Sequence, residues 1–432
     1  MRSLFLSVLA GTVLSLMCSC SLFKADTNVR DYEGHNSMAI QNAIDDCPKG
    51  GTVYIPAGTY SIVTPVKLKS DITIKGDGAG TILLADEKLN DTGAQNAFFS
   101  SSGAPDGANV YGDANITLQG ITFDGDRMEA HRGGLLSLVK AKNITITDCT
   151  FRNSIYIAVG LAGCNNVIVR GCLFENNGLP KPAKESTPAL WTDSAMGNDA
   201  SNIIIEDSTF QNNNWSGCYF MPSGGRIARC RFINNGESSI YTNYNGYDLQ
   251  YIDNYITGAR MSNISCCGIE IAGSKVVVEG NLIENCGDAG IALTNSEDAV
   301  VRDNMILNNG QERGPSGPTG VCLFSLGITV PDRERETRNI LIEDNIIGNI
   351  ETMRATQANA ISGWKSADGA LFRNITFKDN IYGTRTKCVN INSGYLGENC
   401  VFSDNREMIV TEEMREAFIR AMKKRINNGS QS

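Results

Sequence analysis

The sequence predicts an all-β fold, a single-stranded right-handed parallel β-helix of about a dozen coils with a capping helix at each end. Three observations support this prediction. Short units of three strands repeat along the chain, one position of the unit is repeatedly Asn, and turns such as ENNG, QNNN and INNG separate the strands. The 44 glycines and 11 prolines suit many tight turns, because Gly and Asn accept positive φ angles.

Each repeat unit contains a small or amide side chain, followed within three residues by Phe or Ile in most units. Successive units are 22 to 41 residues apart. So short a unit cannot bury its apolar face alone, whereas stacked units bury a continuous core and place like residues about 4.8 Å apart. We therefore interpret the cysteines of this column as small stacking residues and not as disulfide partners. The column comprises Gly120, Cys149, Cys172, Ser208, Cys230, Asn254, Asn281, Asn304, Asn345, Asn380 and Asn405.

Two segments outside the repeats have helical periodicity. Residues 36–47, NSMAIQNAIDDC, offer Asn36 or Ser37 as an N-cap before apolar residues at helical spacing. Residues 411–426, TEEMREAFIRAMKKRI, begin with Thr411 as an N-cap and have acids in the first turn and bases in the last. We expect these helices to close the two ends of the solenoid, since open edge strands invite aggregation.

The N-terminus predicts export. Arg2 precedes LFLSVLAGTVLSLM, an apolar run of signal-peptide length that is short for a membrane span, and CSCS follows. This arrangement resembles the lipobox of bacterial lipoproteins, with Cys20 as the lipidated residue because the small Ser19 precedes it. An ordinary secretory signal is the alternative. We expect a signal peptide over 1–19, a tether over 20–30, the β-helix over 31–410, and a helix with a tail over 411–432.

Charge and histidine content exclude some classes of partner. The formal net charge is −9, which argues against a nucleic-acid partner because phosphate binding needs clustered Lys and Arg. The two histidines, His35 and His131, are too few for a three-histidine metal site. No metal site is predicted, and contact with a membrane is expected only through the N-terminal lipid, in the periplasm or on the outer surface of a bacterial cell envelope.

Residues 50–62, GGTVYIPAGTYSI, and 66–85, VKLKSDITIKGDGAGTILLA, resemble the N-terminal coils of the pectate-lyase-like β-helix superfamily. DGDR at 124–127 and the repeats extend the resemblance over about residues 31–410. This superfamily, which includes polygalacturonases, also contains lyases, epimerases and adhesins, so the resemblance implies the fold and not the reaction. The polygalacturonase motifs do not match: Asp45 and Asp46 lie in the first helix, no histidine lies between glycines, and RIA at 226–228 lacks the lysine.

Insertions point to a groove. Three long units carry their surplus before and after the third strand, near Trp191, Cys322 and Trp364, and such insertions often form the binding face of a solenoid. Alternation along the third strands turns one set of side chains outward to form a floor, where Ala272 and Ala292 leave room for a ligand. The predicted glycan-binding residues are Trp191, Tyr219, Tyr241, Asn243, Arg260 and Trp364.

Glu270 stands between Ile269 and Ile271 and should therefore face outward on this floor. Hydrolysis of a glycosidic bond needs two carboxyl groups roughly 5–9.5 Å apart. Glu237 and Asp288 each lie in a turn one coil from Glu270, whereas Asp193 lies three coils away, at about 14 Å. The sequence thus favours a glycoside hydrolase without a cofactor, with Glu270 and either Glu237 or Asp288 as its catalytic pair and Asp193 as a further candidate.

Two other functions stay open. A polysaccharide lyase acting on a uronate would need a Lys or Arg base and often Ca²⁺, for which Arg260, Arg313, Lys365 and Arg132 are candidates. A non-catalytic glycan-binding or structural surface protein would need only the aromatic residues. The abundance of acids over bases would repel polyanions, which favours the hydrolase. The sequence does not indicate which oligomeric state the protein adopts.

Overall fold

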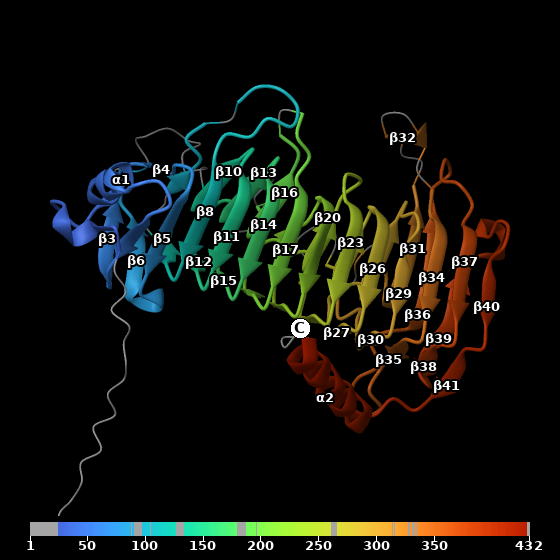
Figure 1. Cartoon of the computed structure of the whole chain (residues 1–432). Helices are drawn as coiled ribbons and strands as arrows, with labels where there is room; N and C mark the ends of the chain where they lie inside the picture. The colour runs from blue at the N-terminus through green and yellow to red at the C-terminus, as the bar shows by residue number, and fades with distance from the viewer. Residues whose placement is uncertain are drawn as a thin grey trace, which may run out of the picture.

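The protein is a right-handed parallel β-helix, as predicted, and Figure 1 shows its three sheets winding along one axis. This computed structural model describes residues 25–87, 89, 97–103, 105–126, 134–178, 187–195, 197–260, 266–312, 314, 316–326, 329–330, 333–334 and 336–429. Within these ranges, sheets A, B and C have 14, 13 and 12 strands. Each complete coil contributes one strand to A, then to B, then to C.

Sheet A consists of β1 (Thr27–Asn28), β2 (Thr52–Ile55), β5 (Ile72–Gly76), β8 (Ala114–Gln119), β11 (Lys142–Thr147), β14 (Asn165–Arg170), β17 (Ser201–Glu206), β20 (Ser223–Ala228), β23 (Tyr247–Ile252), β26 (Ser274–Glu279), β29 (Val300–Arg302), β34 (Arg338–Glu343), β37 (Arg373–Lys378) and β40 (Val401–Ser403). Sheet B consists of β3 (Gly58–Ile62), β6 (Thr81–Ala85), β9 (Thr122–Asp124), β12 (Thr150–Arg152), β15 (Leu173–Glu175), β18 (Thr209–Gln211), β21 (Arg231–Ile233), β24 (Tyr255–Thr257), β27 (Leu282–Glu284), β30 (Met305–Leu307), β35 (Ile346–Gly348), β38 (Ile381–Gly383) and β41 (Arg406–Met408).

Sheet C consists of β4 (Val66–Lys67), β7 (Phe99–Ser100), β10 (Leu136–Val139), β13 (Val159–Ala162), β16 (Leu190–Asp193), β19 (Cys218–Tyr219), β22 (Ile240–Thr242), β25 (Ile269–Ile271), β28 (Ile291–Thr294), β31 (Thr319–Ser325), β36 (Asn359–Lys365) and β39 (Lys387–Ile391). A short antiparallel pair, β32 (Thr329–Val330) and β33 (Arg333–Glu334), lies outside the three sheets. The helices are α1 (Ser37–Asp46), α2 (Glu412–Gly429) and the 3₁₀ turns η1 (Val29–Asp31), η2 (Gly78–Gly80) and η4 (Ser393–Tyr395).

Side-chain ladders hold successive coils in register. In sheet B, Phe123, Phe151, Phe174, Phe210 and Phe232 stack inside the coil with ring centroids 4.4–5.2 Å apart. At the turn between sheets A and B, each Asn from Asn254 to Asn380 donates from Nδ2 to Oδ1 of the next at 2.9–3.0 Å, as far as Asn405. The predicted columns are confirmed, because each buried amide finds its partner one coil away.

A second amide ladder explains the NN pairs of the turn motifs between sheets B and C. The first Asn of each pair, Asn176, Asn212 or Asn234, has a φ of 54–56°. The second Asn points inward instead. Nδ2 of Asn177 donates to Oδ1 of Asn213 at 3.0 Å, and Nδ2 of Asn213 donates to Oδ1 of Asn235 at 2.8 Å. This ladder fixes the chain just before the strands of sheet C.

The cysteines in the described part of the chain are free thiols, so the prediction that the cysteines of the turn column stack without forming disulfides is confirmed. Cys149, Cys172 and Cys230 are buried at the turn column where other coils have Asn or Ser. Burial raises the pKa of Cys172 and of Cys230 to about 12. These thiols therefore stay protonated and serve as small packing groups.

The N-terminal cap agrees with the prediction, except for its boundary. Asn36 caps α1 by accepting hydrogen bonds from the backbone N–H groups of Met38 and Ala39, and Ile40 and Ile44 are buried in the core. The fold begins earlier than residue 31. Thr27 pairs with Val53 in sheet A, so the tether prediction is wrong for the last residues of 20–30. Cys20 and the signal segment lie outside the described residues.

The C-terminal helix α2 is present, but it packs beside the solenoid and not across its last coil (Figure 1). Met414, Phe418 and Ile419 pack against an outward apolar patch on sheet B that includes Leu282 and Met305. Among the described residues of the last coil, Val401 stays 46% and Ile409 49% exposed. The apolar stripe of α2 thus finds its partners on sheet B. No helix in the described ranges is long and apolar enough to cross a membrane.

Candidate functional site

The outward face of sheet C brings most of the predicted floor residues into one column. Trp191, Tyr219, Tyr241, Glu270 and Ala292 occupy equivalent positions in β16, β19, β22, β25 and β28. Alternation along each strand produces this column. Ile240, Ile269 and Ile291, which directly precede Tyr241, Glu270 and Ala292, point inward and are fully buried in the core. Side chains from successive coils are therefore held about 4.8 Å apart along the solenoid axis.

An open pocket of about 220 Å³ lies at one end of this column. We call it the aromatic pocket. The rings of Tyr219 and Tyr241 meet at 4.8 Å with an interplanar angle of 42°. Four of the predicted glycan-binding residues line it together with Asp193. Sheet C supplies its floor, and the turns before β13 and β16 supply its rim. The lining residues are Tyr156, Ile157, Pro188, Trp191, Asp193, Tyr219, Met221, Tyr241, Asn243 and Asn245.

Glu237 lies beside this pocket in the turn before β22. Its side chain is only 6% exposed. Oε2 accepts hydrogen bonds from the hydroxyl groups of Ser216 at 2.9 Å and Tyr219 at 2.8 Å. The preceding Asn235 belongs to the second amide ladder, so the backbone that carries Glu237 is anchored to the coil before it.

Glu270 is half-buried on β25, and its Oε2 accepts a hydrogen bond from the Ser238 hydroxyl at 2.8 Å. Tyr241 lies one coil away in register. Burial raises the pKa of Tyr241 well above its ordinary value, and the negative charges of Glu270 and Glu237 raise it further. The Tyr241 phenol therefore stays protonated. Ser238, the neighbour of Glu237, links the turn before β22 to Glu270 on β25.

Asp288 does not join them at the surface. Its side chain is fully buried, Oδ2 accepts a hydrogen bond from the backbone N–H of Ser316 at 2.9 Å, and no described residue donates a hydrogen bond to Oδ1. A Cβ placed on Gly314 would stand 2.3 Å from Cγ of Asp288, which shows how closely this segment covers the carboxyl. Burial raises the pKa of Asp288. Desolvation outweighs the hydrogen bonds to its ionised form.

The floor also ends sooner than predicted. Ala272 and Ala292 do not leave an open space for a ligand, because they are 4% and 1% exposed. Ala292 packs in a small apolar cluster with Cys267, Ala289 and Cys322, and Ser316 lies within 3.5 Å of the Cys267 thiol. The inserted segment between β30 and β31 packs over these small residues through Ser316. It was predicted to form a wall of the groove, but it covers part of the groove floor.

The remaining predicted residues are dispersed. Asp193 lines the aromatic pocket, three coils from Glu270, so the two carboxylates are not a pair. Trp364 pairs in register with Phe324, beyond the covered floor, and is 48% exposed. Arg260 is exposed, and its backbone N–H donates to the carbonyl of Asn235. Lys365 donates from Nζ to the carbonyls of Ser366 and Gly369. Arg132 and Arg313 lie outside the described residues.

Sequence reasoning missed the groups that orient the carboxyls and form the rim of the pocket. Ser216 and Ser238 orient Glu237 and Glu270, while Tyr156 and Pro188 form part of the rim. All four lie in turns between sheets B and C. Their common position, just after the inward Asn or its equivalent and before a strand of sheet C, was a usable signal.

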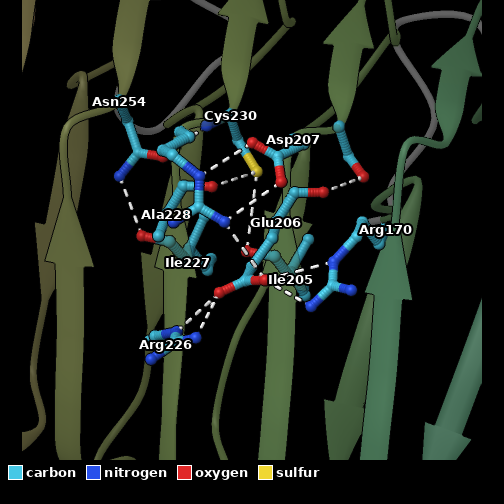
Figure 2. A network of polar contacts seen from close by, with 11 residues as sticks. Arg170, Ile205, Glu206, Asp207, Arg226, Ile227, Ala228, Cys230 and Asn254 are labelled. Carbon is cyan, nitrogen blue, oxygen red and sulfur yellow. Dashed lines mark hydrogen bonds and ion pairs between the residues drawn. The ribbon is translucent and has the colours of Figure 1, made fainter. Parts of the chain in front are cut away.

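A second carboxylate cluster lies on sheet A, away from the pocket. Figure 2 shows Glu206 between Arg170 and Arg226. Its Oε2 is 2.8 Å from Nη2 of Arg170 and 3.1 Å from Nη2 of Arg229, while Oε1 contacts Arg226. Burial acts to raise the pKa of Glu206, but the arginines outweigh it and the pKa lies below its ordinary value. The RIA segment at 226–228 therefore belongs to this ion-pair cluster on sheet A.

Metal ligands are not clustered in the described ranges, where no group of three His, Cys, Asp or Glu side chains is placed to hold an ion. The described polar groups in the aromatic pocket and beside it include the carboxylates of Asp193 and Glu237, hydroxyls and amides. This set can bind hydroxyl groups, and a pair of its carboxyls can transfer protons.

The chain belongs to the right-handed β-helix family, whose sequence profile, described as "Right handed beta helix region", matches residues 90–256 and 228–406. It is similar to plasmin and fibronectin-binding protein A of Streptococcus pneumoniae, with 29% identity over 182 residues, 37% of this chain and 25% of that protein. An uncharacterised protein of Bacillus subtilis, YclG, is 24% identical over 250 residues, 56% of this chain and 36% of that protein. The chain thus matches about a third or less of the length of these relatives.

Solved structures share the fold. The A-module of mannuronan C-5 epimerase AlgE4 from Azotobacter vinelandii superimposes with a TM-score of 0.63 at 17% identity, covering 89% of this chain and 100% of the module. The Streptococcus pneumoniae surface adhesin PfbA superimposes with a TM-score of 0.55 at 18% identity, covering 89% of this chain and 93% of that one. At such identities the likeness concerns the fold alone.

Proposed function

We propose that this protein binds a glycan on the outer face of sheet C and hydrolyses it with Glu237 and Glu270. One observation carries the proposal: Ser238, the neighbour of Glu237, donates to Glu270 from the adjacent coil, and Glu237 itself accepts from the Ser216 hydroxyl, so two carboxyl groups oriented by hydroxyl donors come from neighbouring coils. Adjacent coils are about 4.8 Å apart along the axis, and the proposal requires that the side chains of Glu237 and Glu270 approach within the roughly 5–9.5 Å that hydrolysis needs. One carboxyl would protonate the leaving oxygen while the other acts as nucleophile or activates water.

The aromatic pocket supports the binding half of this proposal. Trp191 and the tilted pair of Tyr219 and Tyr241 offer flat apolar faces beside polar side chains, which is the combination that sugar rings need. Because Tyr219 also donates to Glu237, one side chain joins the pocket to the carboxyl pair. Binding of a ring in the pocket would place the next glycosidic bond toward Glu270.

A second candidate function is favoured by the comparisons. A relative is named for binding plasmin and fibronectin, and a structure with this fold is described as a surface adhesin. A non-catalytic surface protein would use the same aromatic pocket without the carboxyl pair. A lyase is a third candidate, for which Ca²⁺ and a base such as Arg260 would be needed.

Cleavage assays separate the three candidates. The purified protein is incubated with a panel of plant, bacterial and host glycans, with and without Ca²⁺. A hydrolase releases reducing ends without unsaturated products, a lyase releases products that absorb in the ultraviolet, and a binder retains glycans without cleaving them. Retention without products on every glycan would contradict the proposed hydrolase.

We also propose that the protein is exported and anchored in the bacterial cell envelope through Cys20. The N-terminal sequence suggests the lipid anchor, and the likeness to a surface adhesin supports the envelope location alone. In a bacterial host, the native chain should take up labelled fatty acid and sediment with membranes. Cys20→Ala should abolish the labelling and release the protein, whereas Cys18→Ala should not. Equal labelling of the two variants would contradict the assignment.

A further inference from the structure

The aromatic pocket has an uneven distribution of charge. Among its described lining residues, Asp193 is the one with a full charge, and neither Lys nor Arg lines it. The other polar side-chain groups are the amides of Asn243 and Asn245, the tyrosine hydroxyls and the indole N–H of Trp191. A ligand in this pocket is therefore in contact with one carboxylate and several neutral groups.

Asp193 is oriented and keeps one oxygen available. Its Oδ1 accepts hydrogen bonds from the backbone N–H of Ser194 at 2.7 Å and from the Ser194 hydroxyl at 3.4 Å. Described residues donate no hydrogen bond to Oδ2. The side chain is half-buried at the end of β16, two residues after Trp191. A donor on a bound sugar, a hydroxyl or an ammonium, can pair with Oδ2 beside the indole ring.

The volume of the pocket limits what enters. About 220 Å³ lies below the roughly 300–1,000 Å³ of pockets that enclose drug-sized ligands, so the pocket accommodates one sugar unit of a longer chain. A carboxylate on that unit would be brought close to Asp193 in a partly desolvated space, where like charges repel strongly. Neutral and cationic sugars carry no such cost.

We infer that the aromatic pocket selects an uncharged or amine-bearing sugar unit, and that Asp193 is the residue that excludes uronates. The inference rests on the proposed glycan-binding role of sheet C, but not on catalysis. It assigns Asp193 to specificity and leaves the chemical step to Glu237 and Glu270. Asp193 ends β16, which lies near the middle of the solenoid (Figure 1).

Fluorescence of Trp191 tests the inference without any need for activity. The chain has three tryptophans. Trp364→Phe removes one of the other two, and Trp215 is only 3% exposed, so a ligand-dependent change in fluorescence reports Trp191. The probes are mannotriose, cellotriose, xylotriose and chitosan trisaccharide, compared with trigalacturonate and trimannuronate. We expect at least one neutral or amine-bearing probe to quench saturably, and both uronates to bind at least tenfold more weakly.

Substitution of Asp193 identifies the cause. Asp193→Asn should reduce the discrimination against uronates at least tenfold, whereas Asp199→Asn, at an exposed carboxylate six residues along, should leave it unchanged. Thermal unfolding of both variants verifies that they are folded. The inference is overturned if uronates bind as tightly as neutral probes, if Asp193→Asn preserves the discrimination, or if no probe changes the fluorescence. Binding without cleavage would contradict only the proposed hydrolase.

Discussion

Two carboxylate clusters on the same solenoid differ in the groups that surround them. On sheet A, Glu206 is nearly inaccessible and forms ion pairs with Arg170, Arg226 and Arg229 (Figure 2). On sheet C, Glu237 accepts hydrogen bonds from the hydroxyl groups of Ser216 and Tyr219, and Glu270 accepts one from the hydroxyl group of Ser238. Guanidinium groups fix a carboxylate in its ionised form. Hydroxyl donors orient a carboxyl and still permit it to exchange a proton.

This difference teaches that burial of an acid does not identify a catalytic site. Glu206 and Glu237 are 1% and 6% exposed, so exposure does not separate them. The groups that pair with each carboxyl do separate Glu206 from Glu237. We therefore expect that substitutions on sheet A affect stability and that substitutions on sheet C affect activity.

The largest effect should follow removal of a carboxyl from sheet C. Glu270→Gln and Glu237→Gln should each lower kcat on a cleaved glycan by about a thousandfold, because general acid–base groups contribute roughly 10²–10⁴. The melting temperature should stay within about 2 °C. Glu351→Gln, at an exposed turn, is the matched control and should retain full activity. Wild-type activity in Glu270→Gln would remove Glu270 from the mechanism.

The next largest effect should be on stability, through sheet A. Glu206→Ala leaves three arginines without their shared carboxylate and should lower the free energy of unfolding by about 3 kcal/mol, as for broken buried ion pairs. Urea denaturation measures this change. Glu279→Ala removes an exposed pair with Arg302 on the same sheet and should cost at most about 1 kcal/mol. Equal costs would contradict the comparison.

The pH dependence of this effect has a definite sign. Because the pKa of Glu206 is lowered in the folded state, its stabilisation is complete above the ordinary Glu value of about 4.3 and is lost as the pH falls through the lowered pKa. The stability difference between the wild type and Glu206→Gln should therefore be largest above about pH 5 and shrink toward about pH 3. A difference that grows with acidity would contradict this assignment.

A smaller effect should follow loss of a single hydroxyl donor. Tyr219→Phe keeps the ring in the aromatic pocket but removes the hydrogen bond to Glu237, so kcat should fall about tenfold, the equivalent of about 1.4 kcal/mol. The acid limb of the pH–rate profile should move as well. Tyr255→Phe removes a hydroxyl bonded to Glu284 outside this site and should leave the profile unchanged. A shifted profile in both variants would point to an indirect cause.

The smallest effect concerns Asp288. Its raised pKa means that folding favours the protonated form, so its contribution to stability falls as the pH rises above its ordinary value of about 3.9. Asp288→Asn should therefore be stabilising by up to about 1 kcal/mol at pH 8 and neutral near pH 4. Thermal unfolding at the two pH values measures this. A variant destabilised at pH 8 would show that the ionised carboxylate is needed.

The sequence predicted the solenoid because residues at equivalent positions of successive coils contact one another, so the same residue types recur at each repeat. Asn254 bonds to Asn281 and Phe174 stacks on Phe210, so each column in the sequence is a column in space. The outward direction of Tyr241 and Glu270 was predictable for the same reason, since alternation decides the face of a strand.

Loops and helix placement were not predictable in this way. Ser316 covers Asp288, and Ala292 is buried, but no periodic pattern says whether an inserted loop folds outward or inward. The apolar stripe of α2 specified a buried face without specifying which surface would bury it. Ser216 and Ser238 could have been found only through their shared position in the turns before sheet C, because serine is too common in turns to be selected by residue type.

The helix α2 also joins parts of the chain that a solenoid would otherwise leave independent. In a stack of repeats each coil contacts only its neighbours, and the terminal coils can fray one at a time. Arg415 pairs with Glu284 across 131 residues, and Arg425 with Asp253 across 172. The coils between these contacts form a closed loop, so we expect them to open together as one cooperative unit. Amide hydrogen exchange should give similar opening free energies from β34 to β41, and a gradient toward the last coil would show that α2 does not link them.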